Sequence, residues 1–210
     1  MAGKLQNEDH KTEAELVTAG GTKAQLLNDT KIYVTANSIN KTLDDAIADG
    51  DIGNGLSFLN VAIIEDVQAS GVNGGSSTST VQTRVLNTLT QTSSWASLGS
   101  NQITITPTGT QSFLIKFFVP SFRSDDHIAH LYDATGASIL KYGQSAFDSS
   151  GSSATNALCV GSHVVTLSAA NIYEIRDQVT TPKATNGLGD GHSFAGVTNT
   201  FTRVEIYELG

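Results

Sequence analysis

The segment QSFLIKFFVP, residues 111–120, is a short run rich in aromatic and branched apolar residues, among them Phe113, Phe117 and Phe118. The polar stretch SFRSDDH follows it at residues 121–127 and is typical of a turn. Aromatic and β-branched residues suit a pleated, half-buried strand. The segment is therefore predicted to be a β-strand of a packed sheet.

Similar short runs, separated by Gly, Ser, Asn and Pro, fill the chain from about residue 56 onward. The further predicted strands are 59–67, 79–89, 101–107, 127–134, 138–145, 156–167, 172–179 and 201–209. Turns about every ten residues are typical of a sandwich or a barrel. No long helical crossover separates the runs, so the sheets are expected to be antiparallel, and residues 71–79, 148–156 and 181–196 are predicted to be Gly/Ser/Asn-rich loops.

The composition narrows the class of protein. The chain has 210 residues, enough for one sizeable core, and a net charge of −8 with only 12 basic residues. Residues 52–210 hold seven basic and eleven acidic side chains, net −4, so no basic surface for nucleic acid is expected. No run approaches the roughly 20 apolar residues of a membrane span, and MAGKLQNEDHKTEAELV is polar throughout, so synthesis in a cytoplasm is expected.

The segment NDTKIYVTANSINKTLDDAIADGDIGNG, residues 28–55, has a different pattern. Ile32, Tyr33 and Val34 predict a short strand. Ile39, Leu43 and Ile47 form an i, i+4, i+8 stripe that predicts a short helix, with Asn40 or Thr42 as its cap and Gly50 after it. A helix of two or three turns needs a packing partner, either this chain's own core or another subunit.

These patterns predict a division of the chain into three parts: an N-terminal arm at 1–52, a flexible joint GNGLS at 53–57, and a β-sandwich knob at 58–210. A sandwich of about 150 residues has enough interior to fold by itself. The arm is therefore free for attachment, and its apolar residues Ile32, Tyr33, Val34, Ile39, Leu43 and Ile47 are the expected anchoring contacts.

Nothing in the sequence predicts catalysis, a cofactor or a metal. Cys159 and His163 lie four residues apart on a predicted strand, about 13 Å, so they cannot form a thiol–base pair, and Cys159 is expected to be a small core residue. His127 and His130 fall on opposite faces of a strand, so a shared metal is not expected and one of them should face solvent. The lone cysteine can form no intrachain disulfide.

Glycan hydrolysis is a remote alternative. Asp125 and Asp126 would supply one half of a carboxylate pair, but no spacing in the sequence identifies the second, opposed acid that the mechanism needs. Adjacent acids in a turn are usually solvated loop residues.

The order of several segments resembles a known family. They are AIIEDVQASGVNGGSS (62–77), TRVLNT (83–88), the strand with Phe113, Phe117 and Phe118, HIAHLYDATGASILKYGQS (127–145), VVTLSAANIYEIRDQ (164–178) and FTRVEIYEL (201–209). Together they resemble the jelly-roll knobs at the ends of phage fibres and on phage capsids, which are similar to the tumour-necrosis-factor and complement globular-head fold. Residues 21–52 look like an N-terminal module of phage structural proteins.

The resemblance implies an all-β, antiparallel jelly-roll knob preceded by a short strand–helix arm, in a virion protein made in the bacterial cytoplasm. It implies a homotrimer, held to a phage coat or tail adaptor protein through residues 1–52. Two roles are open: a short head or tail fibre that binds a host surface glycan or protein, and a decoration protein that contacts coat subunits. The expected ligand-binding loop residues are Trp95, Arg123, Asp126, His127 and Tyr142, although a lone Trp is also typical of a core.

Overall fold

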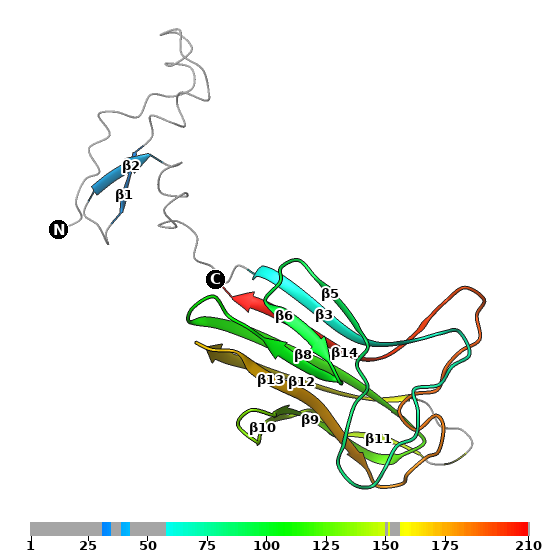
Figure 1. Ribbon diagram of the computed structural model, residues 1–210. Helices are drawn as coiled ribbons and strands as arrows, with labels where there is room; N and C mark the ends of the chain where they lie inside the picture. Colours follow the sequence, from blue (N-terminus) through cyan, green and yellow to red (C-terminus); the bar gives the residue numbers. More distant parts are fainter. Residues whose placement is uncertain (1–30, 35–38, 43–57, 150, 152–155, 210) are drawn as a thin grey trace, which may run out of the picture. The chain divides into compact units, whose positions relative to one another are not determined.

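The computed structural model describes residues 31–34, 39–42, 58–149, 151 and 156–209. The chain divides into two compact units, Met1–Ser57 and Phe58–Gly210, and each is considered by itself (Figure 1).

In the first unit, the described residues form one antiparallel pair, β1 (Lys31–Val34) with β2 (Ile39–Thr42). The predicted strand at 32–34 agrees with β1. Ile39, the first residue of the predicted apolar stripe, lies in β2 opposite Val34, so that residue is not helical. Val34 and Ile39 are both β-branched, a residue type that suits strands. Leu43 and Ile47, the rest of the predicted stripe, lie outside the described residues.

The second unit is a sandwich of two antiparallel sheets that lie face to face (Figure 1). The first sheet has the order β10-β9-β13-β7-β6, with β11 paired to β9 and β4 paired to β13. Its strands are β4 (Gln82–Thr83), β6 (Ala96–Gly99), β7 (Gln102–Ile105), β9 (Asp125–Asp133), β10 (Ser138–Tyr142), β11 (Ala146–Asp148) and β13 (Asn171–Val179).

The second sheet has the order β12-β8-β14-β3-β5. Its strands are β3 (Phe58–Gln68), β5 (Thr88–Gln91), β8 (Gln111–Phe122), β12 (Asn156–Leu167) and β14 (Asn199–Leu209). Along the chain the long strands alternate between sheets: β7 is in the first, β8 in the second, β9 in the first, β12 in the second, β13 in the first and β14 in the second. This alternation is the jelly-roll order. The all-β, antiparallel prediction is confirmed, and the described residues contain no helix.

The core lies between the sheets and is built by alternation along the strands. In β8, Phe113, Ile115, Phe117 and Val119 are fully buried, while the residues between them are only half-buried. Their side chains point to one face because successive residues of a strand alternate. The segment 111–120 thus supplies the centre of the core.

The predicted strand 79–89 is wrong as a single element. The chain pairs with β13 at β4, then crosses the sandwich and pairs with β3 at β5. The Arg84 backbone N–H donates to the Ile175 carbonyl in the first sheet, and the Asn87 N–H donates to the Glu65 carbonyl in the second. The segment changes sheets over these few residues, which brings the Arg84 side chain into the interior. Two short strands, β6 and β11, were not predicted.

Arg84 is fully buried and its guanidinium is bonded on three sides. Nη1 lies 3.1 Å from Asp177 Oδ2, Nε donates to Thr202 Oγ1 at 2.8 Å, and Nη2 donates to the Leu188 carbonyl at 2.8 Å. Desolvation by burial lowers the pKa of Arg84, and the Asp177 carboxylate opposes that shift. The side chain therefore joins β13, β14 and the loop between them.

The two ends of the sandwich can be distinguished by the register of β3 and β14. Leu209 pairs with Phe58 at one end, which we call the base, and Asn199 pairs with Gln68 at the other, which we call the tip. Gln68 lies ten positions after Phe58 along β3, roughly 33 Å at about 3.3 Å per residue. The knob's first residue thus lies at the base, and the loops that follow β3 and precede β14 lie at the tip.

Replacing Arg84 with Leu should lower the free energy of unfolding by about 3–5 kcal/mol, because Asp177 would stay buried without its cation. Chemical denaturation followed by the fluorescence of Trp95, the single tryptophan, measures the change. Lys141→Leu is the control, since Lys141 is exposed on β10 of the first sheet and its replacement should change the free energy by less than about 0.5 kcal/mol. Equal losses in the two variants would contradict the central role of the buried pair.

Candidate functional site: the tip of the sandwich

Two long loops form the tip, residues 69–81 after β3 and residues 180–198 before β14. Their backbones are joined directly: Gly71 N–H donates to the His192 carbonyl at 2.7 Å, and Gly74 N–H donates to the Gly189 carbonyl at 3.0 Å. Leu188 N–H donates to the Gly75 carbonyl at 3.0 Å. Bonds of this kind fix loops that have few apolar side chains of their own.

Asn199 adds a side-chain bond to each loop. Its buried amide nitrogen lies 3.1 Å from the Ala69 carbonyl oxygen and 3.2 Å from those of Val72 and His192. Its amide oxygen accepts from His192 N–H at 3.0 Å. One amide group therefore satisfies backbone groups of both loops, and a buried amide so bonded holds them in one arrangement.

Gly189 is required where the second loop passes over the core. Its φ is +144°, and a Cβ there would lie 2.2 Å from the ring of Phe201. A larger residue would push the loop off the sandwich.

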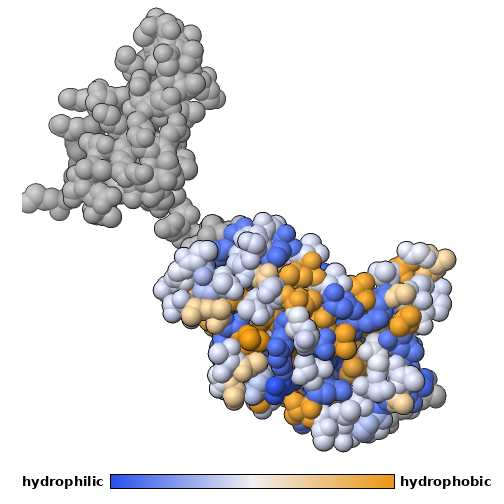
Figure 2. Space-filling view, viewed as in Figure 1, coloured by the Kyte–Doolittle hydropathy of each residue, from blue (hydrophilic) through white to orange (hydrophobic). Residues whose placement is uncertain are grey.

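The tip exposes apolar side chains. Val72 and Val197 are exposed, and Phe194 is 69% exposed although it sits in a loop that the bonds above hold in place. Its ring lies 4.9 Å from the His192 ring. The loop before β14 forms a projecting lobe at the upper right of Figure 2, and this lobe carries hydrophobic side chains. Exposed apolar groups on a fixed loop are typical of a contact surface for a partner.

Two of the five predicted ligand residues, Arg123 and Asp126, lie at the tip. β8 ends at Phe122, whose N–H donates to the Gly187 carbonyl at 3.0 Å. The Arg123 guanidinium lies 4.9 Å from the Phe122 ring centre, and the Arg123 N–H donates to Asp148 Oδ2 at 2.6 Å. Asp126 is exposed, and its Oδ2 accepts from the Thr180 hydroxyl at 3.3 Å. Both residues therefore adjoin the second tip loop.

The placement of His127 in a surface loop is wrong. His127 is buried within β9, and its Nε2 lies 3.4 Å from Asp177 Oδ2, the oxygen that also faces Arg84. Because β9 and β13 are neighbours, the imidazole packs among the interior charges and cannot meet an external ligand.

The expectation that His127 or His130 faces solvent is also wrong, because both are buried. His130 points to the outer face of the first sheet, where the Tyr142 ring covers it at 5.4 Å. Burial, and then the nearby Arg176 cation, lower the pKa of His130.

Tyr142, another of the predicted ligand residues, is exposed on β10, so its side chain is accessible on the side of the sandwich.

Trp95 lies at the base and not at a ligand-binding tip. It is 6% exposed and packs against Phe113, with ring centres 5.0 Å apart. The indole ring is therefore buried together with Phe113 of the core strand β8. The burial of Trp95 agrees with the core alternative given above, and Trp95 does not lie in an exposed loop of the tip.

The candidate chemical groups do not assemble into a catalytic site. Cys159 is fully buried as predicted, its Sγ lies 3.2 Å from the Ala129 nitrogen, and burial raises the pKa of the thiol. His163 lies four residues along the same strand, β12. Asp125 accepts a hydrogen bond from the Thr181 hydroxyl. In the described part of the chain, no three His, Cys, Asp or Glu side chains gather closely enough to hold a metal ion.

Comparison with known proteins gives a likeness of fold. No family model matches the sequence, and no curated protein matches it. Similar solved structures include murine APRIL at pH 5.0 (TM-score 0.45, 12% identity, 71% of this chain and 98% of that chain). PRD1 vertex protein P5 is also similar (TM-score 0.41, 9% identity, 73% of this chain and 99% of that chain). So is the globular domain of zebrafish complement 1qA protein (TM-score 0.36, 12% identity, 71% of this chain and 94% of that chain).

At such identities and TM-scores, function has to be argued from the chain's own residues. Within the described ranges, no helix is long and apolar enough to cross a membrane.

Proposed function

We propose that this chain is a non-enzymatic structural protein of a bacteriophage virion, a trimeric jelly-roll knob that its N-terminal arm holds on the particle and that binds a host surface through its tip. The observation that carries the proposal is the separation of the two ends of the sandwich. The knob begins at Phe58 at the base, while the fixed loops with exposed apolar groups lie at the opposite end of β3. A protein attached at one end and recognising a partner at the other needs this arrangement.

The sequence resemblance supports the virion assignment, since both the knob segments and residues 21–52 resemble parts of phage structural proteins. The arm would contact a coat protein or a tail adaptor protein. The five residues 53–57 leave no room for a long shaft between arm and knob, which favours a knob close to the virion surface. Capsid decoration is therefore kept as the alternative role.

The outer face of the second sheet supports the trimer. Its cross-strand partners form rows: Val164, Leu114 and Tyr207 lie side by side on β12, β8 and β14. Val160 and Phe118 form a second apolar row. Val164 is 52% exposed, and Leu158 on the same strand is 53% exposed. A broad apolar face of this kind is expected to be covered by another copy of the chain about a closed symmetry axis.

Charged residues share the same face: Glu205 and Lys116 lie between the two apolar rows, and Arg203 and Glu65 continue the row of Phe118 and Val160. Arg203 on β14 bonds Glu65 on β3 and Glu205 on its own strand, each at 2.9 Å, and Lys116 on β8 lies 3.9 Å from Glu205. Paired charges of both signs are compatible with burial against a second copy, because each is already neutralised within one chain.

Val164→Asp should convert the trimer to a monomer at micromolar concentration, because an unpaired carboxylate would be buried in the contact. Light scattering measures the mass. Ile139→Asp is the matched control, an apolar residue that is 43% exposed on β10 of the other sheet and should leave the trimer intact. A wild-type protein that already runs as a monomer would contradict the trimer.

Deleting residues 1–52 should leave a folded knob with almost the same melting temperature, since the described sandwich core lies wholly within residues 58–210. The deleted protein should no longer bind particles that lack the native protein, as measured by co-sedimentation. Crosslinking of the full chain on the particle then separates the two roles: contact of the arm with the major coat protein indicates decoration, and contact with a tail component indicates a fibre. Retained binding after the deletion would refute the arm as an anchor.

Phe194→Ser should reduce binding of particles to host cells at least about tenfold, because the most exposed aromatic group of the tip loops would be lost. Ile139→Ser, near the base, is the control and should leave adsorption unchanged. An unchanged adsorption rate in both variants would contradict host binding by the tip and favour the decoration role.

A further inference from the structure

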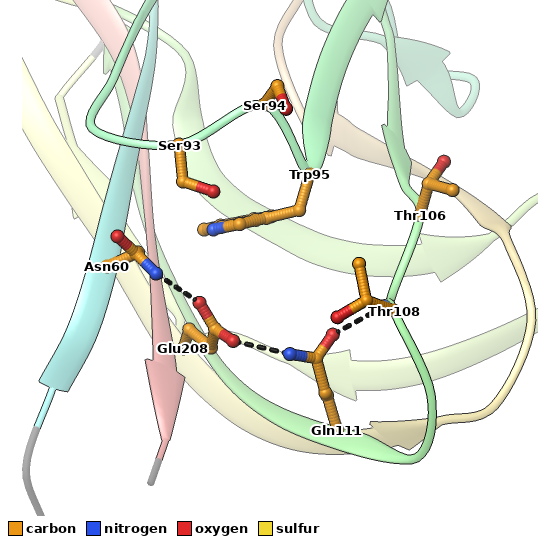
Figure 3. A pocket seen from close by; sticks show the side chains of 8 residues that line it. All are labelled: Asn60, Ser93, Ser94, Trp95, Thr106, Thr108, Gln111 and Glu208. Atoms are coloured by element: carbon orange, nitrogen blue, oxygen red, sulfur yellow. Dashed lines mark hydrogen bonds between the residues drawn. The ribbon is translucent and has the colours of Figure 1, made fainter.

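A polar pocket opens at the base of the sandwich, at the end opposite the tip (Figure 3). Its volume is about 390 Å³, within the range of small-molecule sites. Asn60 of β3, Gln111 of β8 and Glu208 of β14 line one side, and Trp95 and Thr108 come from the loops around β6 and β7. We call it the base pocket. None of the roles discussed above uses it.

The polar side of the base pocket is a fixed array. Glu208 is only 5% exposed, its Oε2 accepts from Asn60 Nδ2 at 2.6 Å, and its Oε1 accepts from Gln111 Nε2 at 2.5 Å. Gln111 is held in turn, because its Oε1 accepts from the Thr108 N–H at 2.8 Å. Each carboxylate oxygen has two lone pairs, so both keep the capacity to accept one further hydrogen bond.

Trp95 forms the opposite wall. Figure 3 shows its indole lying across the pocket from Glu208 and Gln111. Most of the ring is buried, and its indole N–H finds no acceptor among the described residues. A buried indole donor usually has a partner, and within the described part of the chain this one has none. Ser93, Ser94 and Thr106 complete the rim.

We propose that the base pocket binds one neutral sugar unit. A pyranose presents C–H groups that pack on an aromatic ring and hydroxyl groups that donate to a carboxylate and exchange hydrogen bonds with amides and serine or threonine hydroxyls. Trp95, Glu208 and the Asn60 and Gln111 amides offer these partners. Because no Lys, Arg or His is among the described lining residues, phosphorylated, sulfated and acidic sugars lack a counter-charge there.

A small organic cation is the competing ligand, since an aromatic ring and a carboxylate also attract ammonium groups. The pocket fits a cation less well. Only one aromatic ring lines the described part of the pocket, whereas ammonium sites surround the cation with several rings. The proposal depends neither on the arm nor on the tip loops, and so it stands apart from the proposed host-binding role.

The test uses the fluorescence of the full-length chain, in which Trp95 is the only tryptophan. Glucose, galactose, mannose and N-acetylglucosamine are titrated separately, with N-acetylneuraminic acid as the acidic sugar and tetramethylammonium as the cation. At least one neutral sugar is expected to change the Trp95 emission with saturation on the order of 1 mM. Saturation-transfer NMR with the same sugar checks direct contact.

Two variants assign the signal to the base pocket. Thr108 is exposed at the entrance of the base pocket, and Thr108→Phe should block the entrance and abolish the saturable change in Trp95 emission. Thr110→Phe, two residues away and outside the pocket, should leave that change as it is. Glu208→Gln should weaken binding at least about tenfold, because it replaces a charged acceptor. Circular dichroism confirms that each variant is folded.

Three results would overturn the proposal. The first is the absence of any response to neutral sugars at 50 mM, a concentration set roughly fifty times above the expected constant. The second is saturation by tetramethylammonium alone, and the third is sugar binding that survives in Thr108→Phe. Loss of host adsorption in Phe194→Ser would leave the sugar titration unchanged, so failure of the host-binding role and failure of this site are distinguishable.

Discussion

The buried pair of Arg84 and Asp177 determines how the rest of the knob is arranged. A guanidinium inside a protein must find a partner for each polar edge, and Arg84 finds them on β13, on β14 and in the second tip loop. Those partners are 93, 118 and 104 residues away in the sequence. Folding therefore has to bring the crossing segment, the two strands and the loop together at one point. An arrangement that misplaces β13 leaves the buried guanidinium without its counter-ion, and one that misplaces β14 or the loop leaves it without a hydrogen-bond acceptor.

The fixed arrangement of the two tip loops depends on this buried ion pair. Nη2 of Arg84 holds the Leu188 carbonyl, and Leu188 N–H in turn donates to the Gly75 carbonyl of the other loop. Asn199, the first residue of β14, bonds both loops from beneath. Two Gly-rich loops that would otherwise retain much conformational freedom are thus tied to the interior through one cation and one amide. A contact surface built in this way loses little entropy when a partner binds, and this is the physical basis for assigning recognition to the tip.

Alternation of apolar residues was enough to predict most strands, because a run such as 111–120 is decided by local spacing. The crossing at 84–87 could not be predicted in this way, since the run 79–89 has strand-forming residues throughout and only the distant Asp177 explains the change of sheet. His127 and Trp95 were misplaced for the same reason: a polar or aromatic residue in a short segment carries no local sign of what covers it. The exposure of Phe194 could not be predicted either, because the sequence around it predicts only a Gly/Ser/Asn-rich loop.

The two ends of the sandwich use buried carboxylates in different ways. At the tip end, Asp177 lies beside the Arg84 cation, and this ion pair stabilises the fold. At the base, Glu208 is almost as deeply buried but is held by two neutral amides. Amide donors stabilise the carboxylate without cancelling its charge, so Glu208 keeps a strong acceptor directed at the pocket. The amides of Asn60 and Gln111 also fix the direction of the two Glu208 oxygens, and this arrangement suits a ligand that donates hydrogen bonds to them.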